Sequence, residues 1–245
     1  RRRHRATSVG RGPRMTDADA FAARLAEIQA RVDAATLRSG RSLGAVRIIG
    51  ASKTIPADAL RVAVECGLTD LGENRAQELV EKAPALADLQ PTWHFIGALQ
   101  RNKVAMCAPY VAIWHSVDRV ALAETIAQRV PGARVLLEVN TSGEEQKAGI
   151  APDEAPGLLK QAQALGLEVI GLMTVPAAGI DPRPAFAALR AQADALGLPE
   201  CSMGMTEDFE VAIEAGATMV RAGWLAHGKM VIYPIRRHAD GSVLM

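Results

Sequence analysis

The sequence of 245 residues contains no uninterrupted apolar run long enough to cross a bilayer, so we expect no membrane span. Aromatic residues make up only 4% of the chain, which leaves few stacking platforms for single-stranded nucleic acid. Cysteine is also scarce, because Cys66, Cys107 and Cys201 form an odd, widely spaced set without a CxxC pair. Such a set offers no framework for a metal and is typical of reduced thiols in a cytoplasmic protein.

Acidic residues are absent from positions 1–14, which hold six arginines. Without this segment, 22 basic residues face 27 acidic ones, so the net charge of +1 becomes −5. A body of that charge is a poor general partner for nucleic acid. Because Met15 follows directly and 16–19 has the composition of a helix N-terminus, we expect residues 1–14 to be a basic, disordered extension upstream of the biological start. An arginine-rich transit peptide or a nucleic-acid-binding arm is the alternative.

After a long helix predicted at 18–37, short apolar segments alternate with alanine-rich stretches of helical periodicity. The predicted strands are 46–52, 69–72, 92–96, 111–115, 134–140, 167–173, 200–203 and 219–222, and helices are predicted at 56–66, 119–129, 152–165, 185–196 and 206–215. Eight β-then-α units without a linker predict one domain at 15–245, folded as a (β/α)8 TIM barrel. A doubly wound open sheet is disfavoured, because no GxGxxG turn follows the first strand.

Lys53 directly follows the first predicted strand and is the strongest single indication of function. A lysine at the carboxyl end of a buried parallel strand has its stem held by the sheet. Its amine then reaches the crevice where α/β proteins bind ligands. Desolvation favours the uncharged amine, which can attack an aldehyde to form a Schiff base. The alternative is a lysine whose amine simply extends to water.

Other polar residues belong to the same predicted face. Asn74 lies just past the second strand, whereas Ser202-Met203-Gly204 and Arg221-Ala222-Gly223 belong to the seventh and eighth strands, after which barrels commonly bind phosphate. Gly223 allows a close backbone approach, and exposed N–H groups there can form an anion-binding nest. With Lys53 expected across the barrel from them, these residues predict a site for a cofactor that carries an aldehyde and a phosphate.

Two histidines fall within predicted strands, His94 in the third and His115 in the fourth. They lack the spacing of metal ligands, so we expect them to be packed or hydrogen-bonded inside the barrel. Met203, Met205 and Met219 are expected to pack in the core and in the wall of the site.

Six motifs in one order resemble the pyridoxal-phosphate homeostasis proteins, also called the proline synthetase co-transcribed homologue family. They are 72–78, 93–103, 115–118, 171–173, 202–206 and 219–223, and the resemblance extends roughly over 21–228. It implies the barrel of the amino-terminal domain of alanine racemase. It also implies that pyridoxal 5'-phosphate (PLP) is the cofactor and is held as a Schiff base on Lys53.

The resemblance assigns further roles around the cofactor. It implies phosphate contacts from Ser202 and from the backbone around Gly223 and Trp224, with the Ser202-Met203-Gly204 run in the site. It also implies a hydrogen bond from Arg221 to the pyridine nitrogen, with Asn74 nearby. An arginine cannot accept a proton, so it disfavours a charged pyridinium and weakens carbanion stabilisation. Alanine racemase completes its site with a tyrosine from a second domain, and we expect this chain to end where that domain would begin.

The function that follows is intracellular PLP homeostasis and control of amino- and keto-acid balance, without a committed catalytic reaction. Apo PLP-dependent enzymes are candidate partners, and a monomer or weak dimer is expected. A PLP-dependent amino-acid racemase or decarboxylase is the first alternative, and a nucleic-acid binder acting through the arginine-rich arm is the second. Three departures from the family concern the site: Trp224 replaces a usual threonine, Arg75 replaces an aromatic, and the tail after Leu225 is atypical.

Overall fold

The computed structural model describes residues 17–144 and 146–223. The predicted extension at 1–14, the predicted site residue Trp224 and the atypical tail all lie outside the described residues. None of the helices in the described part is long and apolar enough to span a membrane.

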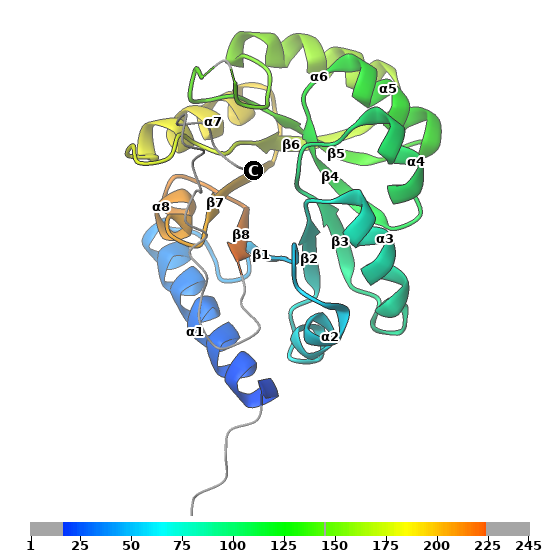
Figure 1. Ribbon diagram of the computed structural model, residues 1–245. Coiled ribbons are helices and arrows are strands. Elements are labelled where there is room, and N and C mark those ends of the chain that lie inside the picture. The colour runs from blue at the N-terminus through cyan, green and yellow to red at the C-terminus, as the bar shows by residue number, and fades with distance from the viewer. Residues whose placement is uncertain (1–16, 145, 224–245) are drawn as a thin grey trace, which may run out of the picture.

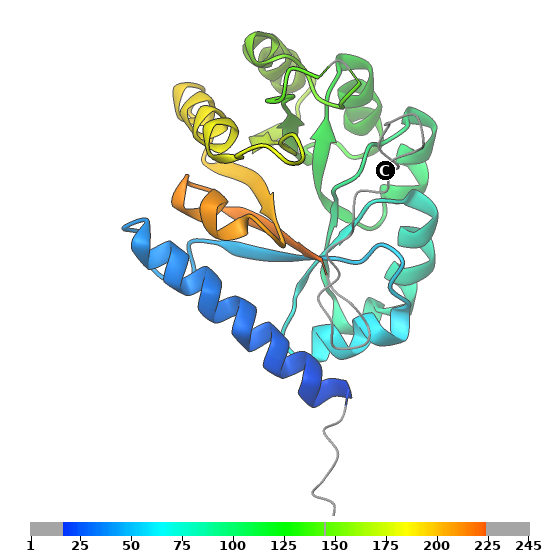
Figure 2. The ribbon, with the colours of Figure 1, turned by 60° about the vertical axis from the view of Figure 1, so that its left-hand side comes forward.

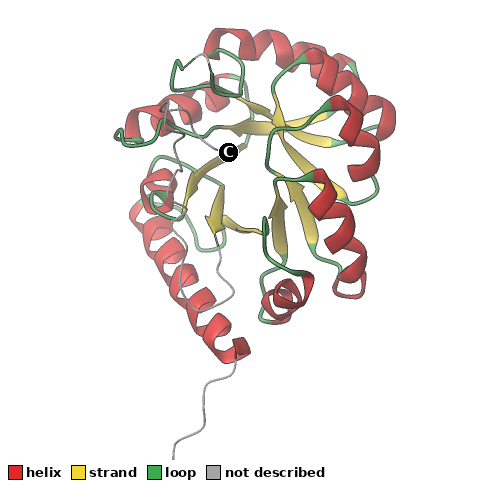
Figure 3. Ribbon diagram, in the orientation of Figure 1, coloured by secondary structure: helices red, strands yellow, loops and turns green. Residues whose placement is uncertain are grey.

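Eight strands close into a barrel in which each strand pairs in parallel with its neighbours in chain order, and helices surround it (Figure 1, Figure 3). The strands are β1 (Arg47–Ala51), β2 (Asp70–Glu73), β3 (Thr92–Phe95), β4 (Val111–Val117), β5 (Arg134–Glu138), β6 (Glu168–Met173), β7 (Glu200–Met205) and β8 (Met219–Gly223). The helices are α1 (Asp17–Arg38), α2 (Ala57–Glu65), α3 (Ala76–Ala85), α4 (Val104–Cys107), α5 (Val120–Arg129), α6 (Ala155–Ala164), α7 (Arg183–Ala195) and α8 (Phe209–Glu214). The predicted (β/α)8 barrel is confirmed.

Several element boundaries differ from the predicted ones. Helix α3 was not predicted, and Pro84 inside its last turn obscures the helical pattern. The single helix predicted at 152–165 consists of a 3₁₀ turn at Pro152–Glu154 followed by α6. Strand β7 runs to Met205, so α8 begins three residues later than predicted.

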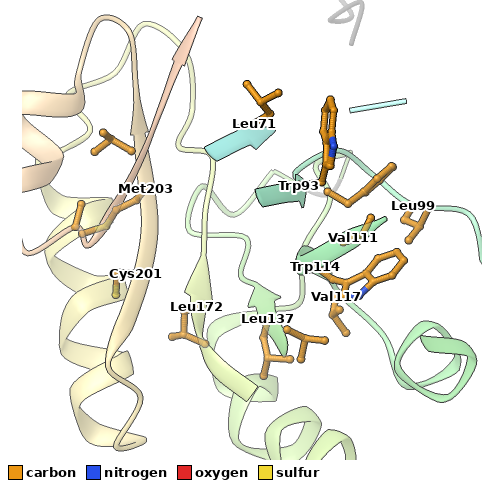
Figure 4. Packing of buried hydrophobic residues seen from close by; sticks show 14 of the residues in the cluster. Leu71, Trp93, Leu99, Val111, Trp114, Val117, Leu137, Leu172, Cys201 and Met203 are labelled. Carbon is orange, nitrogen blue, oxygen red and sulfur yellow. The ribbon is translucent and has the colours of Figure 1, made fainter. Parts of the chain in front are cut away.

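Two apolar clusters hold the barrel together. The larger one combines strand and helix side chains, so it fills the layer between the barrel and its helices; Trp93, Trp114, Leu137 and Met203 belong to it (Figure 4). The smaller one takes side chains from five strands and no helix, which places it inside the barrel; it contains Ile49, Ile113, Leu136, Ile170, Met173 and Met219. Because apolar side chains fill the middle of the barrel, a polar site can form only from the polar residues that these strands also carry.

The long helix α1 closes the barrel on the outside by packing against α8 (Figure 2). Arg31 lies with its guanidinium carbon 4.6 Å from the centre of the Phe209 ring and forms an ion pair of 2.9 Å with Glu210. These contacts hold α8 against α1. Helix α8 follows the carboxyl end of β7.

The strand order corrects one expectation about the site. Strand β1 pairs with β8, with Ala51 opposite Gly223 and Ile49 opposite Arg221. Lys53 therefore lies next to the Arg221–Gly223 segment rather than across the barrel from it. The prediction was wrong because closure of the barrel makes the first and last strands neighbours, although they are far apart in the sequence.

Candidate functional site

Lys53 follows β1 at the carboxyl end of the barrel and is half-buried. Its two chain neighbours are tied to other elements. The amide of Ser52 donates to the carbonyl of Gly72 at 2.7 Å, and the amide of Thr54 donates to Glu78 Oε2 at 2.7 Å. Thr54 adopts a left-handed backbone with φ of 64°, which is uncommon for a β-branched residue and turns the chain sharply after the lysine. The backbone on both sides of Lys53 is thus fixed.

A buried ion network lies beneath this turn. Lys82 of α3 donates to Glu73 Oε2 at 2.8 Å, to Glu78 Oε2 at 2.5 Å and to the carbonyl of Ser52 at 2.7 Å. An ammonium group has three protons, so all of its donors have acceptors. Glu73, which is fully buried, also accepts from the Ser52 hydroxyl at 2.7 Å. The network joins the carboxyl ends of β1 and β2 to α3, and it includes Ser52, the chain neighbour of Lys53.

Asn74 follows β2 on the same face and is half-buried. Its amide donates to Glu73 Oε1 at 2.8 Å, so the same buried carboxylate also positions this residue. A Cβ at Gly97 would lie 2.5 Å from the carbonyl oxygen of Asn74, so only glycine permits the observed approach of the two loops. Asn74 is therefore held from both sides beside Lys53.

Arg221 of β8 is 6% exposed and points into the barrel interior. Its Nη1 donates to the carbonyl and the hydroxyl of Ser202 at 3.1 and 2.8 Å, and its Nη2 donates to the carbonyl of Thr174 at 2.8 Å. Burial lowers the pKa of Arg221 to about 10, which still leaves the guanidinium charged at neutral pH. The structure thus presents a fixed cation at the position where the resemblance implies the ring partner.

The hydroxyls of Ser202 and Thr206 have different surroundings. Ser202 is fully buried, and its oxygen lies between Arg221 and His115 Nδ1, 3.0 Å away. Thr206 follows the end of β7, and its Oγ1 accepts from the amide of Gly223 at 2.9 Å. The Thr206 hydroxyl therefore keeps its own proton for another acceptor, whereas Ser202 is engaged on both sides. Thr206 was not among the predicted site residues, although it ends one of the motifs used for the resemblance.

Two other residues of the predicted site shape the wall. Met203 is fully buried in the layer between barrel and helices, as its expected packing role requires, which leaves only its backbone for the site (Figure 4). Gly204 has φ of 91°, and a Cβ there would lie 2.5 Å from the Cβ of Ala212. The register of β7 against β8 shifts in this stretch, between Ser202 and Met205. Gly204 therefore makes the bulge that brings the end of β7 onto α8.

A buried carboxyl group also faces this end of the barrel and was not predicted. Glu138 ends β5 in line with the interior residue Leu136, and its Oε2 has no hydrogen-bond partner among the described residues. Burial raises the pKa of Glu138 to about 7; Asp118 adds to this rise and Arg221 opposes it. No sequence pattern identifies Glu138, because what distinguishes it is a buried oxygen without a hydrogen-bond partner among the described residues, which only the fold reveals.

The two strand histidines are buried and hydrogen-bonded, as predicted. His94 Nδ1 lies 2.9 Å from His115 Nε2, and His94 Nε2 lies 3.0 Å from Asp70 Oδ1. In the described part of the chain, no group of three acidic, histidine or cysteine side chains is placed to hold a metal ion.

The donors at the carboxyl end of the barrel fit a cofactor with an aldehyde, a phosphate and a ring nitrogen. Lys53 supplies a primary amine, Thr206 a hydroxyl and Arg221 a guanidinium, from β1, β7 and β8, which are consecutive around the barrel. The predicted residues Lys53, Arg221 and Gly223 are thus brought together.

Comparisons with known proteins identify the family. The family described as alanine racemase, N-terminal domain, matches residues 16–230. The pyridoxal phosphate homeostasis protein of Aquifex aeolicus is 43% identical over 220 residues, which cover 84% of this chain and 96% of that protein. The mouse protein of the same name is 36% identical, over 89% of this chain and 90% of its own. The structure of PipY from Synechococcus elongatus with PLP bound has a TM-score of 0.72 and 32% identity, covering 83% of this chain and 97% of PipY. The chain belongs to the alanine racemase N-terminal domain family and, within it, to the pyridoxal phosphate homeostasis proteins.

Proposed function

We propose that the protein binds PLP at the carboxyl end of the barrel, attaches it through Lys53, and acts in PLP homeostasis and amino- and keto-acid balance. The observation that carries this proposal is Lys53 itself, on a backbone fixed by the buried ion network and beside the strand that bears Arg221. PLP supplies an aldehyde that reacts reversibly with a primary amine. The names of the relatives and the PLP-bound PipY structure support the same role.

In this proposal each polar residue has one task. Arg221 donates to the ring nitrogen, and Asn74 lies near the ring. Thr206 donates its hydroxyl proton to the phosphate, because the Gly223 amide already occupies one of its oxygen lone pairs. Ser202, predicted from the resemblance as a phosphate contact, acts instead through Arg221, to which its carbonyl and hydroxyl are bonded.

Binding without turnover follows from the charges around the ring. The ring becomes an electron sink when its nitrogen is protonated, and a guanidinium cannot accept a hydrogen bond from that N–H because it has only donors. A racemase also needs an acid–base residue on the face opposite the lysine. Tyr110 directly precedes β4 and so lies at the amino-terminal end of the barrel, away from Lys53, while Tyr233 lies outside the described residues. These placements favour a carrier over the racemase or decarboxylase alternative.

The proposal extends to partners and location. Apo PLP-dependent enzymes are the partners that a protein holding PLP reversibly would serve, as a monomer or weak dimer. The three cysteines are all free, and two of them are buried, which fits a reducing compartment such as the cytoplasm.

The direct test is a PLP titration of the full chain followed by borohydride reduction and peptide mapping. We expect an absorption band of the bound cofactor, and a reduced adduct on the peptide that contains Lys53. Lys53→Ala should abolish the adduct, whereas Lys103→Ala, the matched control on a surface turn, should keep it. An adduct mapped to Lys103 or Lys147 would contradict the assignment.

A second measurement separates the carrier from the enzyme. The PLP-loaded protein is mixed with a panel of amino acids, and chirality and decarboxylation products are followed over time. We expect no turnover beyond that of free PLP. Sustained conversion of any amino acid would favour the racemase or decarboxylase alternative.

A further inference from the structure

A continuous line of hydrogen bonds runs through the barrel interior, from the start of β2 to β8. Asp70 Oδ1 lies 3.0 Å from His94 Nε2, and His94 Nδ1 lies 2.9 Å from His115 Nε2. His115 Nδ1 lies 3.0 Å from Ser202 Oγ, which accepts from Arg221 Nη1 at 2.8 Å. The two histidines and the serine are fully buried. Five residues from five strands therefore form one chain of contacts.

The chemistry of the two ends fixes the direction of this chain. Arg221 can only donate, and an ionised Asp70 can only accept. His94 must then donate from Nε2 and His115 from Nε2, while the Ser202 hydroxyl donates to His115 Nδ1. In the reverse sense both Arg221 and His115 would donate to Ser202 Oγ, and the hydroxyl proton would lose its acceptor. Each donor has one acceptor only in the first arrangement.

This arrangement requires both histidine rings to be neutral, and burial favours the neutral form of each. Burial holds the pKa of His94 below its usual value, although Asp70 opposes the shift. Burial, and then the neighbouring positive charges, hold the pKa of His115 well below its usual range. The charged groups that face the pair are Arg47, which forms a 3.5 Å ion pair with Asp70, and Arg221. Arg134 also acts on His94.

Arg221 is the group that this chain holds in place. Among the described residues, three of its five N–H protons are bonded, two to Ser202 and one to Thr174. The Nε proton and one Nη2 proton are left for a ligand. Since the Ser202 hydroxyl can accept from Arg221 while donating to His115, the histidines determine which way that hydroxyl points.

We propose that Asp70, His94 and His115 are positioning residues for cofactor binding, which act through Ser202 to orient Arg221 toward the ring of PLP. Asp70 does so from the opposite end of the barrel, where β2 begins. This inference rests on the proposed function, because it assumes that PLP is the ligand of Arg221. It assigns a role to two buried histidines that, among the described residues, belong to no metal-binding group.

Asp70 is the best place to interrupt the chain. It lines a surface cavity of about 350 Å³ between α1 and the loop that precedes β2, and its side chain is 15% exposed. A substitution there faces solvent on one side, so the barrel core keeps its packing. His94 and His115 are fully buried, and replacing them would leave voids as well as unpaired groups.

The first measurement is the tautomeric state of the histidine rings, from long-range ¹H–¹⁵N spectra of the full chain without cofactor. We expect His94 and His115 both neutral and both protonated at Nε2. Asp70→Ala should change the ring signals of His115, which residue 70 does not touch. A wild-type protein with either ring protonated at Nδ1 would overturn the proposal. This result does not depend on PLP binding.

The second measurement is the PLP dissociation constant. Asp70→Ala should weaken binding about three- to tenfold, the effect of loosening one hydrogen-bonded partner of Arg221. Asp70→Asn keeps an acceptor for His94 and should stay within about twofold of the wild type. Two controls are Arg47→Gln and Glu168→Gln. The first removes the ion pair with Asp70 and leaves every hydrogen bond of the chain in place. The second removes a carboxylate at the same end of the barrel, at the start of β6. Neither should change affinity.

The outcomes separate the two proposals. Unchanged PLP affinity in Asp70→Ala, or an equal loss in Arg47→Gln, would overturn the positioning role while PLP binding stands. A wild-type chain that binds no PLP would overturn the proposed function, whatever the tautomers are.

Discussion

Replacing Lys82 by methionine tests whether the buried ion network below Lys53 holds the site together. The side chain of Lys82 is 8% exposed and that of Glu73 is not exposed at all. Methionine fills most of the volume of the lysine stem, so the change removes the charge and three donors with little loss of packing. Glu73 is then a buried carboxylate without its cation.

Removing one partner of a buried ion pair costs roughly 3–5 kcal/mol of unfolding free energy. Here the lower end is expected, because Glu73 keeps the Ser52 hydroxyl and the amides of Asn74 and Arg75 as donors. A loss of about 3 kcal/mol corresponds to a fall in melting temperature of roughly 6–12 °C for a chain of this size. Denaturant unfolding of the cofactor-free protein measures it.

Two comparisons make the result specific. The double variant Lys82→Met/Glu73→Gln should recover part of the loss, because it removes the uncompensated charge. Arg75→Met is the surface control. Arg75 forms an ion pair of 3.2 Å with Glu78, and its side chain is 61% exposed. Such a pair should contribute about 0–1 kcal/mol to the free energy of unfolding. If the free energy of unfolding of Lys82→Met lies within about 1 kcal/mol of the wild-type value, the network does not stabilise the site as argued.

Three further predictions concern the site. Arg221→Ala should weaken PLP binding about ten- to hundredfold, equal to the roughly 1.5–3 kcal/mol of a charged hydrogen bond, without creating turnover; unchanged affinity in a titration would show that Arg221 does not contact the cofactor. Thr206→Val should weaken binding about five- to thirtyfold and Thr206→Ser should restore it, whereas equal dissociation constants for all three proteins would remove Thr206 from the phosphate site. Glu138 has a raised pKa of about 7, so its contribution to stability is present below its ordinary value and is lost as pH rises to about 7. Glu138→Gln should therefore gain stability over the wild type between about pH 5 and 8, by at most roughly 3 kcal/mol in denaturant titrations; parallel pH profiles would contradict the raised pKa.

The barrel could be predicted because its signals are local. Alternation of apolar strands with alanine-rich helices determined the fold class, and the polar ends of strands located Lys53, Asn74 and Arg221 on one face. Helix α3 escaped because Pro84 interrupts its pattern. Lys82 escaped for a different reason: a lysine four residues after Glu78 resembles an exposed helix pair, and only the fold shows that β1 and β2 bury it.

The choice between Ser202 and Thr206 shows where sequence reasoning stops. Both hydroxyls lie in one motif, and nothing local says which faces the ligand. The bulge at Gly204 gives the two hydroxyls different surroundings, because it changes the register of β7 against β8 between Ser202 and Met205. Ser202 is left in the interior beside Arg221, and Thr206 is brought beside Gly223. A contact between residues 17 positions apart required the three-dimensional register.

The balance of charge around Arg221 explains why one site can hold the cofactor firmly and still lack an obvious reaction. Arg221 has no direct ion pair among the described residues, where it donates to two carbonyls and a hydroxyl. A carboxylate paired with Arg221 would weaken its hydrogen bond to a ring nitrogen, whereas neutral acceptors fix its direction without a direct counter-ion. Burial raises the pKa of Glu138, the buried carboxyl nearby, to about 7, which weakens it as a counter-ion. Arg221 thus has neutral hydrogen-bond partners and no direct counter-ion among the described residues, which favours an unprotonated ring over carbanion chemistry.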